Sequence, residues 1–216
     1  MDTDFWLNRW KSSDIGFHQG EANPLLVKYF PSLSLAKDDR VFVPMCGKTR
    51  DIAWLLSQGH TVVGVELSQL AIEQLFAELC TEPQVSHIGK LSLYQAPNID
   101  VFVGDIFDLS SNVLGSVDAI YDRAALVALP KEMRQRYTEH LLDITFQAPQ
   151  LLIVWKYDLT QMDGPPFSIS ADEVRQHYAQ NYQPKLVDSI DVPGKLKEVD
   201  GAQENVWLLQ RSITHQ

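Results

Sequence analysis

The sequence predicts a doubly wound α/β sheet of the Rossmann type, and three observations support this prediction. Strand-like segments rich in β-branched residues alternate with stretches of helical periodicity along most of the chain. The segment 41–48 (VFVPMCGK) runs from such a strand into a tight turn at Gly47. The next strand ends in Glu66, nineteen residues after that glycine. In a Rossmann-type crevice an acid at this place accepts hydrogen bonds from the two ribose hydroxyls of a nucleotide.

The composition indicates an ordinary globular protein. Of its 216 residues 45% are hydrophobic and 10% aromatic, which suits one domain over 1–216 with a sizeable core. No apolar run approaches the roughly 18 residues of a membrane span, and the acidic start lacks the features of a signal peptide. Two cysteines suit a reducing cytoplasm, and a formal charge of −10 argues against nucleic acid. We therefore expect a cytoplasmic protein without metal, membrane or nucleic-acid partners, and a monomer because the sequence shows no coiled coil or obvious sticky edge.

The first part of the chain contains an N-terminal segment and the predicted crevice. Residues 1–22 are aromatic-rich without a clean helical or strand period, which is compatible with a lid over an apolar ligand. Asn23 as N-cap and Pro24 at the first helical position then predict a short helix. There follow a strand at 41–44, a helix at 49–58, a strand at 62–66 and a helix capped by Ser68.

The second part continues the alternation. Pro130 begins one predicted helix, and the capping box formed by Ser170 and Glu173 begins another. The nearly continuous apolar run at 151–157 is typical of a central strand covered on both faces. Trp155 near its end is interpreted as a core residue, with a place in the crevice as the alternative. Further strands are expected at 90–94, 99–103, 117–122, 185–191 and 205–211, the last two as a C-terminal antiparallel hairpin.

The turn after the first strand favours one adenosine cofactor over others. Nicotinamide and flavin sites carry three glycines, the second of which lets the backbone approach the pyrophosphate. Here Gly47 stands alone, and Phe42 occupies the position where a phosphate-binding P-loop has its first glycine. S-adenosyl-L-methionine has no pyrophosphate, so a single glycine is sufficient. Gly47 together with Glu66 therefore favours S-adenosyl-L-methionine, with S-adenosyl-L-homocysteine as product.

Two further strand ends carry charged residues toward the same crevice. Asp105 and Ile106 follow a strand, where methyltransferases typically offer an acid to the adenine amino group and an apolar side chain to its face. The alternative for Asp105 is loop solvation or a helix cap. Arg123 ends the next strand and is expected to face the cofactor carboxylate or the substrate. Asp122 is interpreted as a residue that holds Arg123 or the loop by hydrogen bonds.

Four segments, in order along the chain, resemble the bacterial thiopurine S-methyltransferase family. They are Trp10 with His18-Gln19, PMCGK at 44–48, VGVELS at 63–68, and YDRAALVALP at 121–130. The resemblance extends over essentially the whole chain and includes an unusual Cys-Gly-Lys turn. Two positions depart from the family pattern: Met45 stands where leucine is common, and Ala124 replaces a small residue that is often glycine.

This resemblance implies a fold, a reaction and a set of contacts. The fold is a seven-stranded, mostly parallel Rossmann-like methyltransferase sheet. The reaction is methylation of the sulfur of aromatic or heterocyclic thiols, with selenium and tellurium compounds as further acceptors in detoxification. The implied cofactor contacts are Trp10, the backbone at Met45, Glu66, Asp105, Ile106 and Arg123.

The residues around the N-terminal segment have competing interpretations. Aromatic residues at such positions are usually core, but a lid over a heterocycle also needs them. We therefore predict cofactor contact for Trp10 and substrate contact for Phe17. His18 is interpreted as structural, exposed or polarising, and it ranks second to Arg123 as a candidate catalytic residue. Cys46 has no implied histidine partner and is interpreted as structural.

Methyl transfer from a sulfonium is an in-line displacement, so the protein mainly has to align the acceptor and exclude water. Thiopurine-like thiols ionise readily, and a cation such as Arg123 near the sulfur favours the thiolate without a strong general base. Three alternatives remain at this stage: a halide or thiocyanate methyltransferase, a non-catalytic cofactor-binding or regulatory module, and an oxidoreductase whose turn accepts a dinucleotide.

Overall fold

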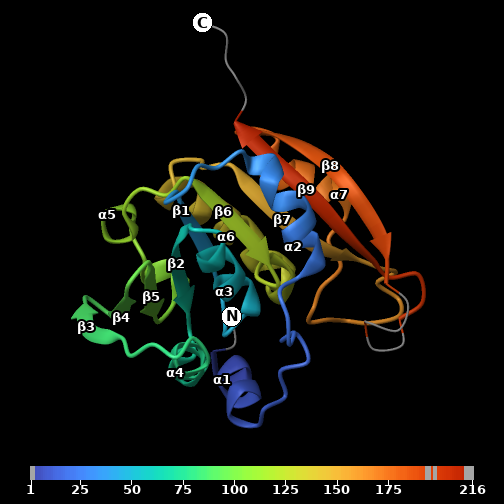
Figure 1. The fold of residues 1–216 in the computed structure, drawn as a ribbon. Helices are drawn as coiled ribbons and strands as arrows, with labels where there is room; N and C mark the ends of the chain where they lie inside the picture. The colour runs from blue at the N-terminus through green and yellow to red at the C-terminus, as the bar shows by residue number, and fades with distance from the viewer. Residues whose placement is uncertain (1–2, 193–195, 197–198, 212–216) are drawn as a thin grey trace, which may run out of the picture.

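A single mixed sheet organises the computed structural model, which describes residues 3–192, 196 and 199–211 (Figure 1). Its strands are β1 Arg40–Pro44, β2 Thr61–Glu66, β3 Gln84–Ile88, β4 Leu91–Ala96, β5 Ile99–Val103, β6 Ala119–Arg123, β7 Gln150–Lys156, β8 Tyr182–Asp191 and β9 Gln203–Arg211. The order is β3-β4-β5-β2-β1-β6-β7-β9-β8. The five strands from β5 to β7 run parallel to their neighbours within that group, and both edges are antiparallel.

Helices cover both faces of this sheet. The helices of the described chain are α1 Thr3–Lys11, α2 Pro24–Tyr29, α3 Arg50–Ser57, α4 Gln69–Glu78, α5 Ser111–Leu114, α6 Lys131–Ile144 and α7 Ala171–Tyr178, with short 3-10 turns η1 Phe30–Leu33, η2 Ile106–Asp108 and η3 Leu126–Ala128. The apolar side chains of α2, α3 and α4 share one core cluster with one face of the strands. Those of α5, α6 and α7 share a second cluster with the opposite face.

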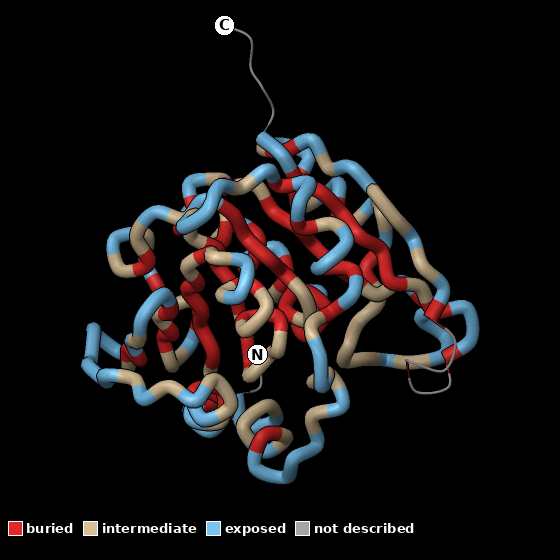
Figure 2. Tube along the Cα trace, viewed as in Figure 1, coloured by how far each residue is buried: buried red, intermediate tan, exposed pale blue. Residues whose placement is uncertain are grey.

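Alternation along the strands produces these two clusters. In β1, Val41 and Val43 pack toward the α3 side, whereas Phe42 between them packs toward the α6 side. Because both faces are covered, the central strands are buried along nearly their whole length, as Figure 2 shows. The β-branched runs of the sequence therefore became the parallel centre of the sheet.

Polar caps begin the helices where the sequence predicts them. The Asn23 side chain accepts hydrogen bonds from the backbone N–H groups of Leu25 and Leu26, and Ser68 accepts one from Ala71. Ser170 accepts one from the N–H of Glu173, as in a capping box. Each cap satisfies N–H groups that the first helical turn leaves without an intrahelical partner.

The sheet has nine strands rather than the expected seven. The segments chosen from sequence patterns correspond to eight of them, and β3 is the strand that they missed. All five β3 residues are exposed, so this strand has no buried face and shows no apolar alternation. It is held instead by its antiparallel pairing with β4. The sheet is also mixed rather than mostly parallel, because antiparallel strands extend both edges.

The N-terminal segment contains a helix that the sequence analysis did not predict. Helix α1 spans Thr3–Lys11, and only Trp10 within it is buried. Trp6 and Trp10 lie four residues apart, so both aromatic rings lie on one face of α1. This spacing was the available signal, but two positions were too few to reveal a helical period.

The strand order places a crevice at the carboxyl ends of the central strands. From β1 the chain passes through α3 to β2 on one side, whereas β6 lies on the other side of β1. Ligands of open α/β sheets bind at such a switch point. Helix α1 lies near α4 at this end of the sheet (Figure 1). Within the described ranges no helix has the length and apolarity required to cross a membrane.

Candidate active site

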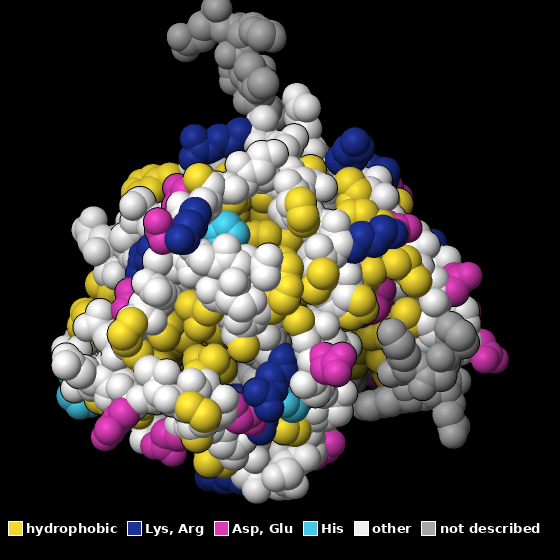
Figure 3. Space-filling model, viewed as in Figure 1, with side chains coloured by type: hydrophobic (Ala, Val, Ile, Leu, Met, Phe, Trp, Pro, Cys, Tyr) yellow, Lys and Arg dark blue, Asp and Glu magenta, His cyan; other side chains and the backbone are white. Residues whose placement is uncertain are grey.

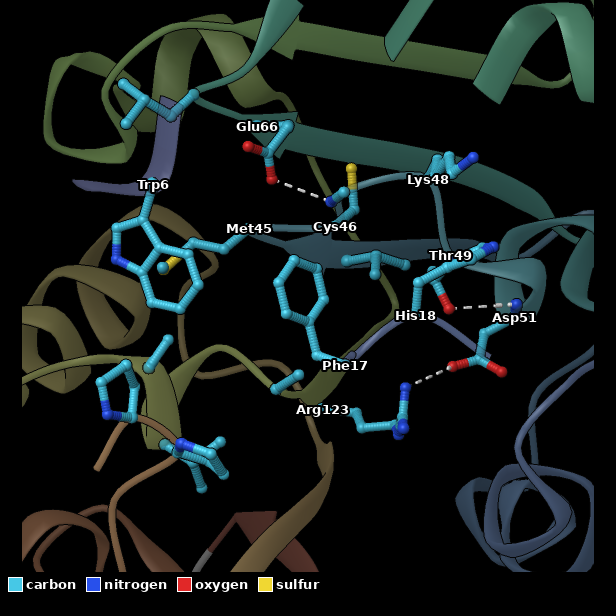
Figure 4. A pocket seen from close by; sticks show the side chains of 18 of the residues that line it. Trp6, Phe17, His18, Met45, Cys46, Lys48, Thr49, Asp51, Glu66 and Arg123 are labelled. Carbon is cyan, nitrogen blue, oxygen red and sulfur yellow. Dashed lines mark hydrogen bonds and ion pairs between the residues drawn. The ribbon is translucent and has the colours of Figure 1, made fainter. Parts of the chain in front are cut away.

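A cavity of about 570 Å³ opens at the carboxyl ends of β1, β2, β5 and β6, a size ordinary for small-molecule sites (Figure 4). The structure brings every predicted site residue to its lining: Trp10, Phe17, His18, Met45, Gly47, Glu66, Asp105, Ile106 and Arg123. We call one side the β1–β2 wall, formed by residues 45–49, 65–67 and 104–106. The opposite side, the β6–β7 wall, is formed by Tyr121, Arg123, Ala124, Val127, Ala128, Ile153, Trp155, Pro165, Pro166, Leu196 and Glu204.

The turn of the β1–β2 wall depends on left-handed backbone. Met45 has φ +47° and Gly47 has φ +53°. A Cβ at Gly47 would lie 2.9 Å from Cζ2 of Trp10, so glycine lets the indole pack directly on the turn. Cys46 between them is buried beneath Gly64, where an added Cβ would lie 2.9 Å from the Cys46 sulfur. Burial raises the pKa of the Cys46 thiol well above its ordinary value, which suits a structural role.

Glu66 joins this turn to the next helix. One carboxylate oxygen accepts a hydrogen bond from Gly47 N–H at 2.8 Å, and the other accepts one from Ser68 N–H at 2.9 Å. Burial raises the pKa of Glu66, and these backbone bonds act against that rise. A carboxylate has about four lone-pair sites, so these two bonds leave acceptor capacity on Glu66. Glu66 thus lines the cavity with its carboxylate held in place by backbone N–H groups.

Asp105 and Ile106 lie where β5 ends. Asp105 accepts a hydrogen bond from Phe107 N–H at 3.0 Å and therefore caps η2, which is the alternative that the sequence left open. Its position in the cavity lining also leaves an adenine contact open to it. Ile106 is buried, and its backbone carbonyl lies 2.8 Å from Nε2 of His140. The loop that presents both residues is therefore anchored to α6.

Asp122 and Arg123 are neighbours on β6 but serve opposite sides of the sheet. Asp122 is buried on the far side, where it accepts hydrogen bonds from the Tyr137 hydroxyl at 2.8 Å and from Leu126 N–H at 3.2 Å. Burial raises the pKa of Asp122 to about 6. Asp122 was interpreted as holding either Arg123 or the loop, and these bonds show that it holds the loop after β6. Ala124, next in the chain, has φ +64°, which explains why this position suits glycine.

Arg123 instead pairs with Asp51, a residue that the sequence analysis missed. Arg123 Nη1 lies 3.9 Å from Asp51 Oδ2, and the two side chains are 11% and 2% exposed. Figure 4 shows Arg123 facing Asp51 across the cavity from Glu66. Asp51 is on α3, and no local motif connects it with β6 in the sequence. Only the folded sheet brings the two residues together.

His18 lies among cationic side chains. Lys48 and Arg50 both pair with Glu78, at 2.9 and 3.3 Å. Burial lowers the pKa of His18, and the positive charge of Lys48 lowers it further. Figure 3 shows basic side chains gathered beside a His near the lower centre of that face. A neutral imidazole supplies no positive charge at pH 7, which leaves Arg123 as the stronger candidate for electrostatic work.

Aromatic rings from the N-terminal segment line the cavity. Phe17 is edge-on to Trp6 at 5.9 Å and to Trp10 at 5.5 Å between ring centroids. Trp10 is only 4% exposed, and Figure 4 shows Phe17 between the Glu66 and Arg123 sides. Trp6 was not among the predicted site residues.

Most of the β6–β7 wall was also missed. Trp155 was interpreted as core with the crevice as its alternative, and it both packs against the core and lines the cavity. Its position at the carboxyl end of a parallel strand was the available signal. Pro165, Leu196 and Glu204 come from loops and a late strand, and no sequence pattern pointed to them.

Comparison with solved structures shows a methyltransferase fold. A 1,6-didemethyltoxoflavin-N1-methyltransferase from Burkholderia thailandensis, solved with its substrate and S-adenosylhomocysteine, aligns with a TM-score of 0.68 at 17% identity, covering 97% of this chain and 87% of that one. A magnesium protoporphyrin IX methyltransferase from Synechocystis PCC 6803, solved with S-adenosylhomocysteine, aligns with a TM-score of 0.67 at 12% identity, covering 98% and 100%.

Comparison of sequences identifies the family. The family model for thiopurine S-methyltransferase (TPMT) matches residues 1–212. A thiopurine S-methyltransferase from Xanthobacter autotrophicus is 53% identical over 98% of this chain and 100% of its own length. One from Acinetobacter baylyi is 46% identical over 97% and 98%. The protein is therefore an S-adenosyl-L-methionine-dependent methyltransferase enzyme, and it belongs to the thiopurine S-methyltransferase family.

Proposed function

We propose that the protein transfers the methyl group of S-adenosyl-L-methionine to the sulfur of aromatic or heterocyclic thiols. One observation carries the proposal: a single cavity places the buried acid Glu66 on one wall and the cation Arg123 with an apolar surface on the other. The first wall suits an adenosine cofactor, and the second suits a flat acceptor whose sulfur bears negative charge. Membership of the family supports the same assignment.

The residues of the β1–β2 wall fit the cofactor. Glu66 keeps acceptor sites for the ribose hydroxyls after binding the two backbone N–H groups. The remaining proposed contacts are Trp10, the backbone at Met45 and Gly47, Asp105, Ile106 and Arg123. When bound, the cofactor supplies a methyl group that its sulfonium already activates for in-line displacement.

The chain's own residues would then position the acceptor and stabilise its negative charge. Trp155 and the paired prolines Pro165 and Pro166 line the same cavity as the rings of Trp6 and Phe17 and add apolar surface to it. Arg123 stabilises the thiolate in a site of low dielectric constant, where a preorganised charge acts more strongly than in water. Residues of the N-terminal segment exclude water above the reacting groups. No strong base is required, because an aromatic thiol of this kind ionises readily.

The proposal is tested by calorimetric titration with S-adenosylmethionine and S-adenosylhomocysteine, followed by a methyl-transfer assay on an aromatic thiol. We expect binding of both and turnover of the thiol. Iodide in competition with the thiol distinguishes the halide alternative, because a halide enzyme prefers iodide. Binding with no transfer to any thiol, halide or selenium acceptor contradicts the proposed reaction and supports a binding protein.

We further propose three finer properties. Selenium and tellurium compounds serve as acceptors, because they share the soft, anionic character that Arg123 favours in a thiolate. Volatile methylated products would be measured by gas chromatography.

The protein acts as a cytoplasmic monomer, which sedimentation and cell fractionation test. Residues 1–22 act as a lid on a single domain; slower hydrogen exchange over residues 3–22 on adding S-adenosylhomocysteine is the expected result.

A further inference from the structure

Three groups from two separate parts of the chain, the start of α2 and strand β6, converge on the Asp51 carboxylate. Asn23 N–H, at the start of α2, donates to Oδ1 at 2.6 Å, and the Tyr121 hydroxyl, on β6, donates to Oδ2 at 3.0 Å. Arg123 Nη1 lies 3.9 Å from the same Oδ2. Asp51 is 2% exposed and lies in the first turn of α3. A buried carboxylate with this many partners is held in one place.

We propose that Asp51 is the positioning residue for Arg123, an inference that rests on the proposed function because it assigns Asp51 to the same site. Oδ1 and Oδ2 each accept a normal hydrogen bond from another group. At 3.9 Å, Arg123 is attracted by the charge of Asp51 without forming the tight bidentate fork that Arg and carboxylates often make. The guanidinium is therefore oriented while its N–H donors stay available to a ligand.

The anchor itself is rigid. Asp51 N–H donates to the Thr49 hydroxyl at 3.3 Å, the side-chain cap of α3. Negative charge in the first turn of a helix is favoured by the partial positive charge of the helix N-terminus. A long arginine side chain facing a cavity loses its position readily unless such an anchor holds it, and a misplacement of about 1 Å can cost roughly a hundredfold in rate.

The same carboxylate also holds Asn23, the residue that directly follows the N-terminal segment. Asn23, which donates to Asp51, also donates from its side chain to Gln19 at 3.4 Å. Gln19 lines the cavity next to His18 and Phe17. Asp51 thus connects Asn23, which follows the segment that lines the cavity, to Arg123, the cation proposed to face the acceptor.

A double-mutant cycle with Asp51→Asn and Arg123→Gln tests the proposal on the full-length protein. Asp51→Asn alone is expected to lower kcat/KM for an aromatic thiol by roughly ten- to a hundredfold. In the Arg123→Gln background, Asp51→Asn is expected to lower kcat/KM by less than about threefold, because the group that Asp51 positions is already gone. Equal losses in both backgrounds would show that Asp51 is merely structural and would overturn the proposal.

Asp122→Asn is the matched control for burial and charge. It removes a buried acid beside Arg123 that faces the opposite side of the sheet. Asp122→Asn is expected to change kcat/KM by the same factor whether position 123 carries Arg or Gln. If the Asp122 change coupled to Arg123 as strongly as the Asp51 change, the specific role of Asp51 would be contradicted.

Two arrangements keep the test decisive. If Asp51→Asn does not fold, Tyr121→Phe removes one donor to Asp51 and is expected to lower kcat/KM severalfold only while Arg123 is present; equal losses in both backgrounds overturn the proposal. If the wild-type enzyme methylates no thiol, the proposed function fails by itself. The cycle is then measured on S-adenosylhomocysteine affinity, where coupling between Asp51 and Arg123 supports the positioning role and additivity contradicts it.

Discussion

The two walls of the cavity are built differently. The β1–β2 wall comes from three short segments at strand ends, and its two acids, Glu66 and Asp105, both accept hydrogen bonds from backbone N–H groups. The β6–β7 wall is assembled from side chains of β6 and β7, of the loop after β6 and of the segment around Pro165, together with Leu196 and Glu204. Backbone geometry and two acids held by backbone N–H groups can serve one constant ligand. Side chains from scattered segments can change one at a time, so this wall is where we expect acceptor choice to be decided.

Glu66→Gln should have the largest effect if the β1–β2 wall holds the cofactor. A hydrogen bond to a charged group contributes about 1.5–3 kcal/mol, so losing two ribose bonds to the carboxylate predicts at least a hundredfold weaker cofactor binding. Calorimetric titration with S-adenosylhomocysteine measures it. Asp105→Asn is the comparison on the same wall. We expect it to weaken cofactor binding less than Glu66→Gln does, since part of the Asp105 carboxylate is already used to cap η2. Unchanged affinity in Glu66→Gln would remove Glu66 from the site.

Arg123→Ala should come next and affect turnover rather than folding. Removing a preorganised charge near a developing or ionised centre typically costs about a hundredfold in kcat. The measurement is steady-state kinetics with an aromatic thiol, beside thermal unfolding to establish that the fold is retained. Arg123→Lys serves as control, because it keeps the charge while altering its geometry. Wild-type kinetics in Arg123→Ala would eliminate the proposed role.

Trp155→Ala is the sharpest test of the difference between the walls. It removes an apolar surface from the β6–β7 wall, so we expect the KM for an aromatic thiol to rise about tenfold, in line with the loss of roughly 1–2 kcal/mol of aromatic contact. Cofactor affinity should change less than about twofold. An equal loss of both affinities would mean that the two walls do not act separately.

Asp122→Asn should have the smallest effect on catalysis, since this acid faces away from the cavity. Its pKa of about 6, raised by burial, lies above the ordinary value of 3.8. Between about pH 4 and pH 6 the folded state therefore binds more protons than the unfolded state, and this group's contribution to stability falls as pH rises. The two-unit difference corresponds to about 3 kcal/mol at most.

Urea unfolding at pH 4, 5, 6 and 7 measures this contribution as the difference between wild type and Asp122→Asn. We expect that difference to shift in favour of the variant as pH rises through this range, with kcat/KM within about threefold of wild type. A difference that does not vary with pH would show that Asp122 titrates normally in the folded protein.

Much of the fold follows from local patterns. The caps at Asn23, Ser68 and Ser170 were predicted because each side chain bonds N–H groups two or three residues ahead, which is a purely local interaction. The central strands were predicted because burial on both faces requires unbroken apolar runs. Strand β3 was missed because its exposed residues carry no such pattern, and α1 because only two spaced tryptophans mark its buried face.

The candidate site divides in the same way. By itself the sequence determined the family and the residues at strand ends, because a tight turn, its glycine and the acid after the next strand lie in contiguous motifs. The tertiary structure decided which partners these residues have: Asp51 rather than Asp122 for Arg123, backbone N–H groups for Glu66, and Trp155 as part of the cavity. The physical reason is that an ion pair or a cavity wall depends on distance in space, and only the order and register of the strands bring α3, β6 and β7 together.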